Sequence, residues 1–221
     1  MKITDVVTYV AKAYVGKPVT GFRGFYEDVA SRISHGFTAV YVKVVTDEGL
    51  IGWGEAIARE APEATAAVIN NLFKPMLIGK DPLDNEVLWE QLFSAMRIRG
   101  HYAGYYVEAL SGIDLALWDI KGKYLGKPVH KLLGGAFRDR VKAYASSVLF
   151  MSPEDTVKEV ERLVQEGFRY VKVKIGRGYE MDKAVIKAIR DSLGSEVEIM
   201  VDANTAYNVS TAIKVGRMLE K

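Results

Sequence analysis

The feature that most constrains the fold is a strand–helix alternation that repeats in the second half of the chain. Three apolar segments have the character of β-strands: VKAYASS (141–147), RYVKVKI (169–175) and VEIMVDA (197–203). Their starts are about 28 residues apart, the length of one βα unit in a parallel sheet. Ser152 is a good cap for the first following helix, and Asn208 or Ser210 could cap the last. The pattern predicts parallel α/β architecture.

Three βα units leave two architectures open. A closed barrel takes about eight strands, so these units would form only part of one. A small doubly wound sheet could stand by itself, but its first strand is typically followed by a glycine-rich phosphate loop. The chain has AYASSVLF (143–150) at that place, without a GxGxxG pattern. The sequence therefore favours an incomplete TIM-type barrel.

The preceding residues have the pattern of a small α+β domain. Strands are predicted at 2–13, 37–46 and 51–56, and helices at 62–73, 84–97 and 105–124. The glycine-punctuated segment 16–36 is a candidate lid, in which Arg23 and Tyr26 are candidate substrate contacts. We expect an α+β domain over residues 1–135 and barrel units over residues 136–221.

Polar side chains occupy the carboxyl ends of two predicted strands. Lys172 and Lys174 share one face of their strand, and Asp202 and Asn204 share one face at the end of the next. Each pair alone has an ordinary explanation, because such lysines are often solvated and such an aspartate often caps a helix. Barrel active sites form at these strand ends. A carboxylate that holds a hard cation, beside a lysine that removes a proton, would suit metal-assisted proton abstraction.

Composition argues against several other functions. The 221 residues include 30 Lys and Arg against 28 Asp and Glu, and the two signs are interspersed, which disfavours nucleic acid or a membrane surface as the main partner. No cysteine is present, so thiolate zinc sites, disulfides and cysteine nucleophiles are excluded. The sequence MKITDVVTYV lacks the pattern of a signal peptide, and we expect a cytoplasmic protein.

One long motif resembles a family signature. ALSGIDLALWDIKGKYLGKPVHKLLGG (109–135) is similar throughout to the segment that closes the N-terminal capping domain of the mandelate racemase and muconate lactonizing enzyme family, in the enolase superfamily. GWGEA (52–56) and the pair VKVKIG and VDAN agree with it. The resemblance covers the whole chain. It implies an α+β capping domain followed by about three units of an incomplete enolase-type barrel.

The resemblance also implies roles for the strand-end residues. Lys174 would take the proton α to a substrate carboxylate, and Lys172 would be its companion at that carboxylate. Asp202 would be the first of three carboxylate ligands of Mg²⁺, with Asn204 as a polar neighbour in contact with substrate. The chemistry so implied is a lysine base with Mg²⁺ stabilising an ene-diolate. The other two metal ligands and a second acid/base group would come from later strands, outside these 221 residues.

Within the family, the polar and aromatic lid residues favour a sugar-acid dehydratase. A racemase, an epimerase or a cycloisomerase shares the same first step and stays open. A non-catalytic partial-barrel remnant or assembly subunit is a further alternative. The expected partners are a small carboxylate substrate, most of all a sugar acid, and either further copies of this chain or a chain that carries the rest of the barrel.

Overall fold

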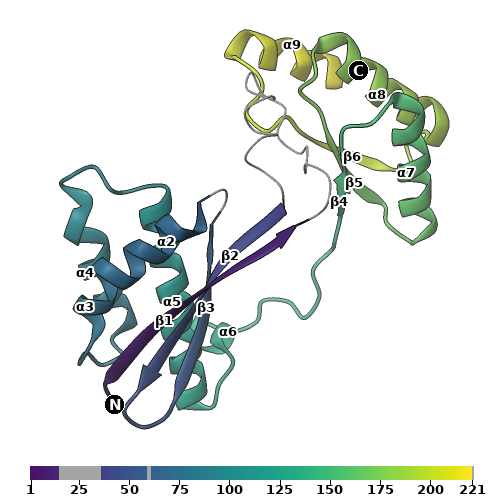
Figure 1. The fold of residues 1–221 in the computed structure, drawn as a ribbon. Helices are drawn as coiled ribbons and strands as arrows, with labels where there is room; N and C mark the ends of the chain where they lie inside the picture. The colour runs from purple at the N-terminus through teal and green to yellow at the C-terminus, as the bar shows by residue number, and fades with distance from the viewer. Residues whose placement is uncertain (15–35, 59–60, 221) are drawn as a thin grey trace. The chain divides into compact units, whose positions relative to one another are not determined.

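A computed structural model describes residues 1–14, 36–58 and 61–220 (Figure 1). These residues form two compact units, which divide between Asp139 and Arg140. Each unit has its own sheet and its own group of buried apolar side chains. Of the helices that the structure describes, none is both long enough and apolar enough to cross a bilayer.

The first unit contains an antiparallel sheet in the order β1-β2-β3. Its strands are β1 (Ile3–Tyr14), β2 (Gly36–Thr46) and β3 (Ile51–Ile57), which confirms the predicted strands apart from small differences at their ends. Val40, Val42 and Val44 are fully buried, as the alternation of a strand with one covered face requires. Gly49 turns the chain from β2 to β3 with φ +78°, a conformation that favours glycine.

The helices of the first unit follow β3 in the sequence. They are α2 (Pro62–Val68), η1 (Ile69–Phe73), α3 (Lys74–Leu77), α4 (Asn85–Arg97), α5 (Tyr105–Leu125) and α6 (Val129–Leu132). The predicted helix over 62–73 is thus part of a longer helical run with a π-helical middle. At the end of η1 the N–H of Lys74 donates to the carbonyl of Ile69, five residues back. Pro75 follows and has no N–H to continue a regular α-helical ladder.

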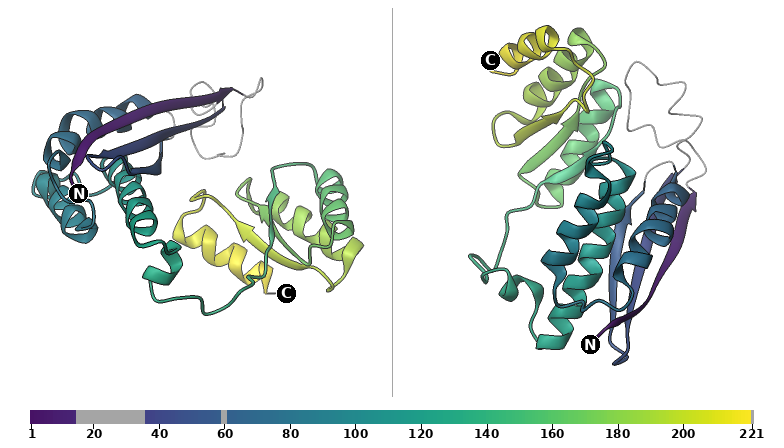
Figure 2. Two further views of the ribbon diagram at one scale, coloured as in Figure 1. Left: turned by 90° about the horizontal axis from the view of Figure 1, so that it is seen from below. Right: turned by 90° about the vertical axis from the view of Figure 1, so that its left-hand side faces the viewer.

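Helix α5 packs directly against the sheet of the first unit, as Figures 1 and 2 show. Its inner face is the predicted one, with these residues buried: Leu110, Ile113, Leu117 and Ile120. A Cβ on Gly54 of β3 would lie 2.0 Å from the carbonyl oxygen of Gly112, and one on Gly52 would lie 2.1 Å from that of Ala116. Glycine at these positions therefore allows the helix and strand backbones to approach closely.

Two polar side chains of α5 contact the outer edge of β3, which is the last strand in the described sheet. Asp119 Oδ2 accepts the N–H of Trp53 at 2.8 Å, and Lys123 Nζ donates to the carbonyl of Ile51 at 2.9 Å. The two side chains also pair with each other at 2.6 Å, one helical turn apart. They satisfy backbone groups of β3 that no neighbouring strand pairs.

The second unit contains a parallel sheet in the order β4-β5-β6. Its elements are β4 (Ala145–Val148), α7 (Pro153–Gln165), β5 (Tyr170–Lys174), α8 (Tyr179–Leu193), β6 (Glu198–Asp202) and α9 (Val209–Leu219). Ser152 caps α7 by accepting the N–H of Asp155 at 3.1 Å. Asn208 caps α9 by accepting the N–H of Thr211 at 2.9 Å, so the cap is Asn208 and not Ser210.

The first strand of this unit differs from its predicted position. The sequence predicted a strand from residue 141, whereas β4 begins at Ala145 and reaches Val148. Ala145 pairs with Val171, next to the first residue of β5, so within the described part of the chain no strand pairs with the residues before Ala145. Apolar alternation alone does not reveal where a neighbouring strand begins.

One face of the parallel sheet packs against helices. Val171 and Val173 of β5 are fully buried in a cluster that includes residues of both α7 and α8. Lys172 and Lys174 point to the opposite face, since alternate strand residues do so. Helices on one face only are typical of a barrel, whereas a doubly wound sheet has helices on both faces. The arrangement of α7 and α8 therefore agrees with the barrel prediction.

Candidate active site

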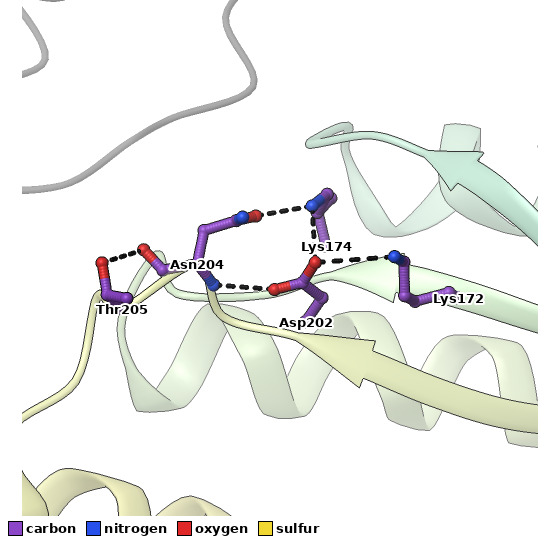
Figure 3. A network of polar contacts seen from close by, with 5 residues as sticks. All are labelled: Lys172, Lys174, Asp202, Asn204 and Thr205. Carbon is purple, nitrogen blue, oxygen red and sulfur yellow. Dashed lines mark hydrogen bonds and ion pairs between the residues drawn. The ribbon is translucent and has the colours of Figure 1, made fainter. Parts of the chain in front are cut away.

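The candidate site lies at the carboxyl ends of β5 and β6. These strands are parallel neighbours, so their ends meet at one edge of the sheet. The register pairs Lys174 with Asp202 and Lys172 with Met200. Figure 3 shows the two lysines and Asp202 pointing toward one another above this edge. The predicted convergence of lysines and carboxylate is present in the folded chain.

A connected set of polar contacts joins the four strand-end residues (Figure 3). Lys174 Nζ donates to Asp202 Oδ2 at 2.7 Å and to Asn204 Oδ1 at 2.6 Å. Lys172 Nζ lies 3.7 Å from the same Asp202 oxygen. The backbone N–H of Asn204 donates to Asp202 Oδ1 at 2.9 Å. We call these four residues the lysine–aspartate network.

The charges of the network favour an ionised Asp202. The hydrogen bond from Lys174 and then that from the Asn204 backbone hold the pKa of the Asp202 carboxyl below its ordinary value. The side chains of Lys172, Lys174 and Asp202 are 22%, 15% and 30% exposed. The ammonium groups are thus partly shielded from water, yet a small solute could still reach the carboxylate.

The turn after β6 has an uncommon backbone. Asn204 has φ +45° and Thr205 has φ +63°. Asparagine tolerates this left-handed region, but a β-branched residue there is strained. The N–H of Ala206 donates to the carbonyl of Ala203 at 3.0 Å and closes the turn. This conformation brings the side-chain amide oxygen of Asn204 to Lys174 and the backbone N–H of Asn204 to Asp202.

The structure unites four of the six predicted site residues. Lys172, Lys174, Asp202 and Asn204 form one network, and Asp202 does not cap the following helix. The other two, in the predicted lid, lie outside the described residues: Arg23 and Tyr26. Their expected contacts with substrate stay predictions.

Sequence reasoning missed Tyr144. Lys172 Nζ lies 5.5 Å from the centroid of its ring, a distance suited to a cation–π contact. Tyr144 directly precedes β4 and is partly exposed. An aromatic residue inside the predicted strand 141–147, which neighbours the lysine strand, was the available signal. It was uninformative because the start of β4 was placed too early.

The site offers carboxylate and amide oxygens, which are the types of ligand that a hard cation such as Mg²⁺ binds. A carboxylate that is ionised and partly exposed, with an amide oxygen beside it, is the donor type that Mg²⁺ prefers. Within the described residues, no group of three or more His, Cys, Asp or Glu side chains is placed to hold a metal ion. Asp202 therefore fits one position of a magnesium site whose further ligands would come from elsewhere.

Two family models match the chain. The model described as mandelate racemase / muconate lactonizing enzyme, N-terminal domain, matches residues 27–134, and the one described as enolase C-terminal domain-like matches residues 155–221. Together they cover most of both units, including the whole lysine–aspartate network.

Curated relatives agree with the models. The chain is 38% identical over 220 residues to the D-galactarolactone cycloisomerase of Agrobacterium fabrum, covering 98% of this chain and 55% of that protein. It is 38% identical over 191 residues to the arabinonate dehydratase of Saccharolobus solfataricus, covering 85% of this chain and 51% of that protein. The chain thus spans about half the length of the curated relatives it matches.

Solved structures give the same result. The 3,6-anhydro-D-galactonate cycloisomerase of Zobellia galactanivorans superposes with a TM-score of 0.82 at 32% identity, covering all of this chain and 56% of that one. The α+β unit is accordingly a capping domain, and the parallel unit is the first part of an enolase-type barrel. The chain belongs to the mandelate racemase and muconate lactonizing enzyme family of the enolase superfamily.

Proposed function

We propose that the chain supplies the proton-abstracting part of a sugar-acid dehydratase site. The observation that carries the proposal is the contact of Lys174 Nζ with both Asp202 and Asn204, with Lys172 beside the same carboxylate. The name of the arabinonate dehydratase relative supports a sugar-acid substrate. The substrate would be a small hydroxy acid that binds with its carboxylate near Lys172.

Lys174 would act as the base. A neutral Nζ takes the proton from the carbon α to the carboxylate, the C–H bond breaks, and its electron pair moves into the carboxylate to give an ene-diolate. The resulting ammonium then donates to Asp202 and Asn204, which is the set of contacts seen here. Dehydration follows when the β-hydroxyl leaves with a proton from a second acid, which we place on later strands.

Asp202 would hold one position of a bound Mg²⁺. The ion would supply positive charge where the ene-diolate develops negative charge. Lys172 would add a second positive group near the substrate carboxylate. The remaining ligands, like the second acid, would come from strands beyond β6, on this polypeptide or on another chain.

A cycloisomerase is the second candidate. It is favoured by the 38% identity over 220 residues to a D-galactarolactone cycloisomerase. Both reactions begin with the same proton abstraction, and they differ in what the ene-diolate does next. A dehydratase loses water and yields a 2-keto acid, whereas a cycloisomerase product keeps every atom of its substrate. A racemase or epimerase would return the proton to the other face.

The test is exchange of the α-proton in D₂O. The chain would be combined with a polypeptide that carries the remaining strands, taken from the arabinonate dehydratase relative, together with Mg²⁺ and a panel of sugar acids. Proton NMR would follow loss of the α-hydrogen signal and would identify the product. We expect Lys174→Gln to slow exchange by about 10²-fold or more, the usual scale for a general base.

Lys43→Gln is the control, because Lys43 is a strand lysine of β2 that lies outside the lysine–aspartate network, and its replacement should leave exchange unchanged. Equal exchange in the parent and Lys174→Gln proteins would contradict the assignment of the base. No exchange with any substrate or complement would favour the non-catalytic alternative.

A further inference from the structure

A second carboxylate lies near the site but outside the lysine–aspartate network. Asp182, in the first turn of α8, is only 2% exposed. Its Oδ1 accepts the backbone N–H of Gly176 at 2.9 Å and of Arg177 at 3.1 Å. Both residues belong to the loop that follows β5, directly after Lys174. One side of the carboxylate therefore fixes this loop.

The other side of the same carboxylate holds the loop that follows β6. Asp182 Oδ2 accepts a hydrogen bond from the hydroxyl of Tyr207. Burial, and then the Asp182 carboxylate, raise the pKa of the Tyr207 hydroxyl, which keeps it a donor over the ordinary pH range. A buried carboxylate needs several partners, and here its donors come from two different loops.

The two loops also touch through their backbones. Gly176 has φ +118°, and a Cβ built on it would lie 2.9 Å from the Cβ of Ala206 and 3.1 Å from the carbonyl oxygen of Ala203. The N–H of Ile175 donates to the carbonyl of Asp202 at 3.1 Å. No side chain fits between the loops at this point, so movement of one would be transmitted to the other.

The strained turn lies between two anchors. Asp202 ends β6 on one side, and Tyr207 is held by Asp182 on the other. Left-handed Asn204 and Thr205 lie between them. Such conformations persist where the surrounding structure holds them firmly. Loss of the Tyr207 anchor would let the turn relax and carry the Asn204 amide away from Lys174.

We propose that Asp182 and Tyr207 are positioning residues, which hold the loops after β5 and β6 so that Asn204 and Asp202 face Lys174. Neither residue touches the lysine–aspartate network directly in the contacts described. The catalytic meaning of the proposal rests on the proposed function, but the geometric claim does not.

The experiment measures hydrogen exchange of individual backbone amides by NMR in the ¹⁵N-labelled chain at one fixed pH. We expect Tyr207→Phe to speed exchange of the Asn204 and Arg177 amides about tenfold, because the local opening of both loops becomes easier. Amides in the middle of α7, such as that of Val160, should keep their rates. A residue that merely stabilised the fold would instead raise all of these rates together.

Two further variants make the test specific. Asp182→Asn keeps an oxygen for the loop amides and an amide that can donate to the Tyr207 hydroxyl, so exchange at Arg177 should stay within about threefold of the parent. Asp182→Ala should raise exchange in both loops at least as much as Tyr207→Phe. Asp191→Asn, at the exposed far end of α8, is the matched control and should change neither loop.

Unchanged exchange at Asn204 in Tyr207→Phe would overturn the proposal, as would a uniform rise that includes Val160. Equal effects of Asp182→Asn and Asp182→Ala would also overturn it. These outcomes are separate from those of the proposed function. Selective loop opening without any α-proton exchange would refute the reaction alone, and Lys174-dependent exchange without loop opening would refute the positioning alone.

Discussion

Strands β2 and β5 have nearly the same sequence and very different surroundings. Residues 41–45 read YVKVV and residues 170–174 read YVKVK. In both, the valines on either side of the central lysine are buried, and that lysine points to the opposite face. Lys43 Nζ lies 6.0 Å from the ring centroid of Trp53. Lys172, at the corresponding place in β5, lies beside Asp202 and Tyr144.

The comparison separates what a strand pattern determines from what its neighbours determine. Alternation sets which face a lysine occupies, in either unit. The side chains around it on the neighbouring strands then decide which rings and carboxylates the lysine meets. The antiparallel register places Trp53 opposite Lys43, whereas the parallel register places Met200 opposite Lys172 and leaves Asp202, two residues further along β6, within 3.7 Å of its Nζ.

The largest effect should come from the close helix–strand contact of the first unit. Gly54→Ala would place a Cβ 2.0 Å from the Gly112 carbonyl oxygen, and we expect a loss of about 3 kcal/mol or more in the free energy of unfolding. Urea unfolding followed by tryptophan fluorescence would report this, since the three tryptophans all lie in that unit.

The second unit offers the opposite case, Gly216 of α9. A Cβ there meets nothing within 4 Å. Gly216→Ala should therefore stabilise the chain by about 0.5–1 kcal/mol, as Gly to Ala does in a helix interior. If Gly54→Ala were as mild as Gly216→Ala, the close packing of α5 on β3 would be wrong.

A smaller effect should distinguish the left-handed turns of the two units. Gly49 occupies this conformation without strain, whereas Thr205 occupies it at φ +63°. Gly49→Thr should destabilise the chain by about 1–2 kcal/mol. Thr205→Gly should stabilise it by about 1 kcal/mol, because relief of strain exceeds the added freedom of the unfolded chain. Chemical denaturation of both variants would measure these changes in the free energy of unfolding. A destabilising Thr205→Gly would contradict the strained turn.

The smallest effect concerns two exposed carboxylates, one in each unit. The Lys74 ammonium lowers the pKa of Asp5, and Lys158 followed by the Ser152 hydroxyl lowers that of Asp155. Their stabilising contributions should be complete above the unfolded value of about 3.9 and should disappear as the pH falls through the lower folded values. Carboxyl ¹³C shifts would give both midpoints.

Removal of the lysines should separate the two carboxylates. Lys74→Gln should return the Asp5 midpoint most of the way to its ordinary value. Lys158→Gln should return that of Asp155 only in part, because Ser152 still donates to it. High salt should weaken both lysine contacts, since both pairs are exposed. If both midpoints returned fully to the ordinary value, the Ser152 hydrogen bond would have no effect on the pKa of Asp155.

Much of the fold could be predicted from the chain, for reasons visible in particular residues. Apolar alternation located β2 and β5, and a three-to-four-residue spacing located the buried face of α5. The start of β4 was missed because strand ends depend on the pairing partner. The π-helical residues 69–73 were missed because apolar spacing does not register the pattern of backbone hydrogen bonds.

The side chains of the candidate site could be predicted from the sequence, but the residues that hold its loops could not. Lys172, Lys174 and Asp202 could be placed together because parallel strands end at one edge. Asp182 and Tyr207 are 25 residues apart and form no motif, so only the folded loops bring them together. The left-handed Thr205 also contradicts its own local preference, so its conformation could not be read from its residue type.

The contacts of Asp119 and Lys123 with β3 bear on how copies of this chain avoid one another. An exposed strand edge with free N–H and carbonyl groups is a template onto which another chain can add a strand. Here the N–H of Trp53 and the carbonyl of Ile51 are already occupied by side chains of the same molecule. Both side chains come from the signature segment 109–135. Part of that signature would thus protect the capping domain against sheet polymerisation, a role separate from any chemistry at the barrel.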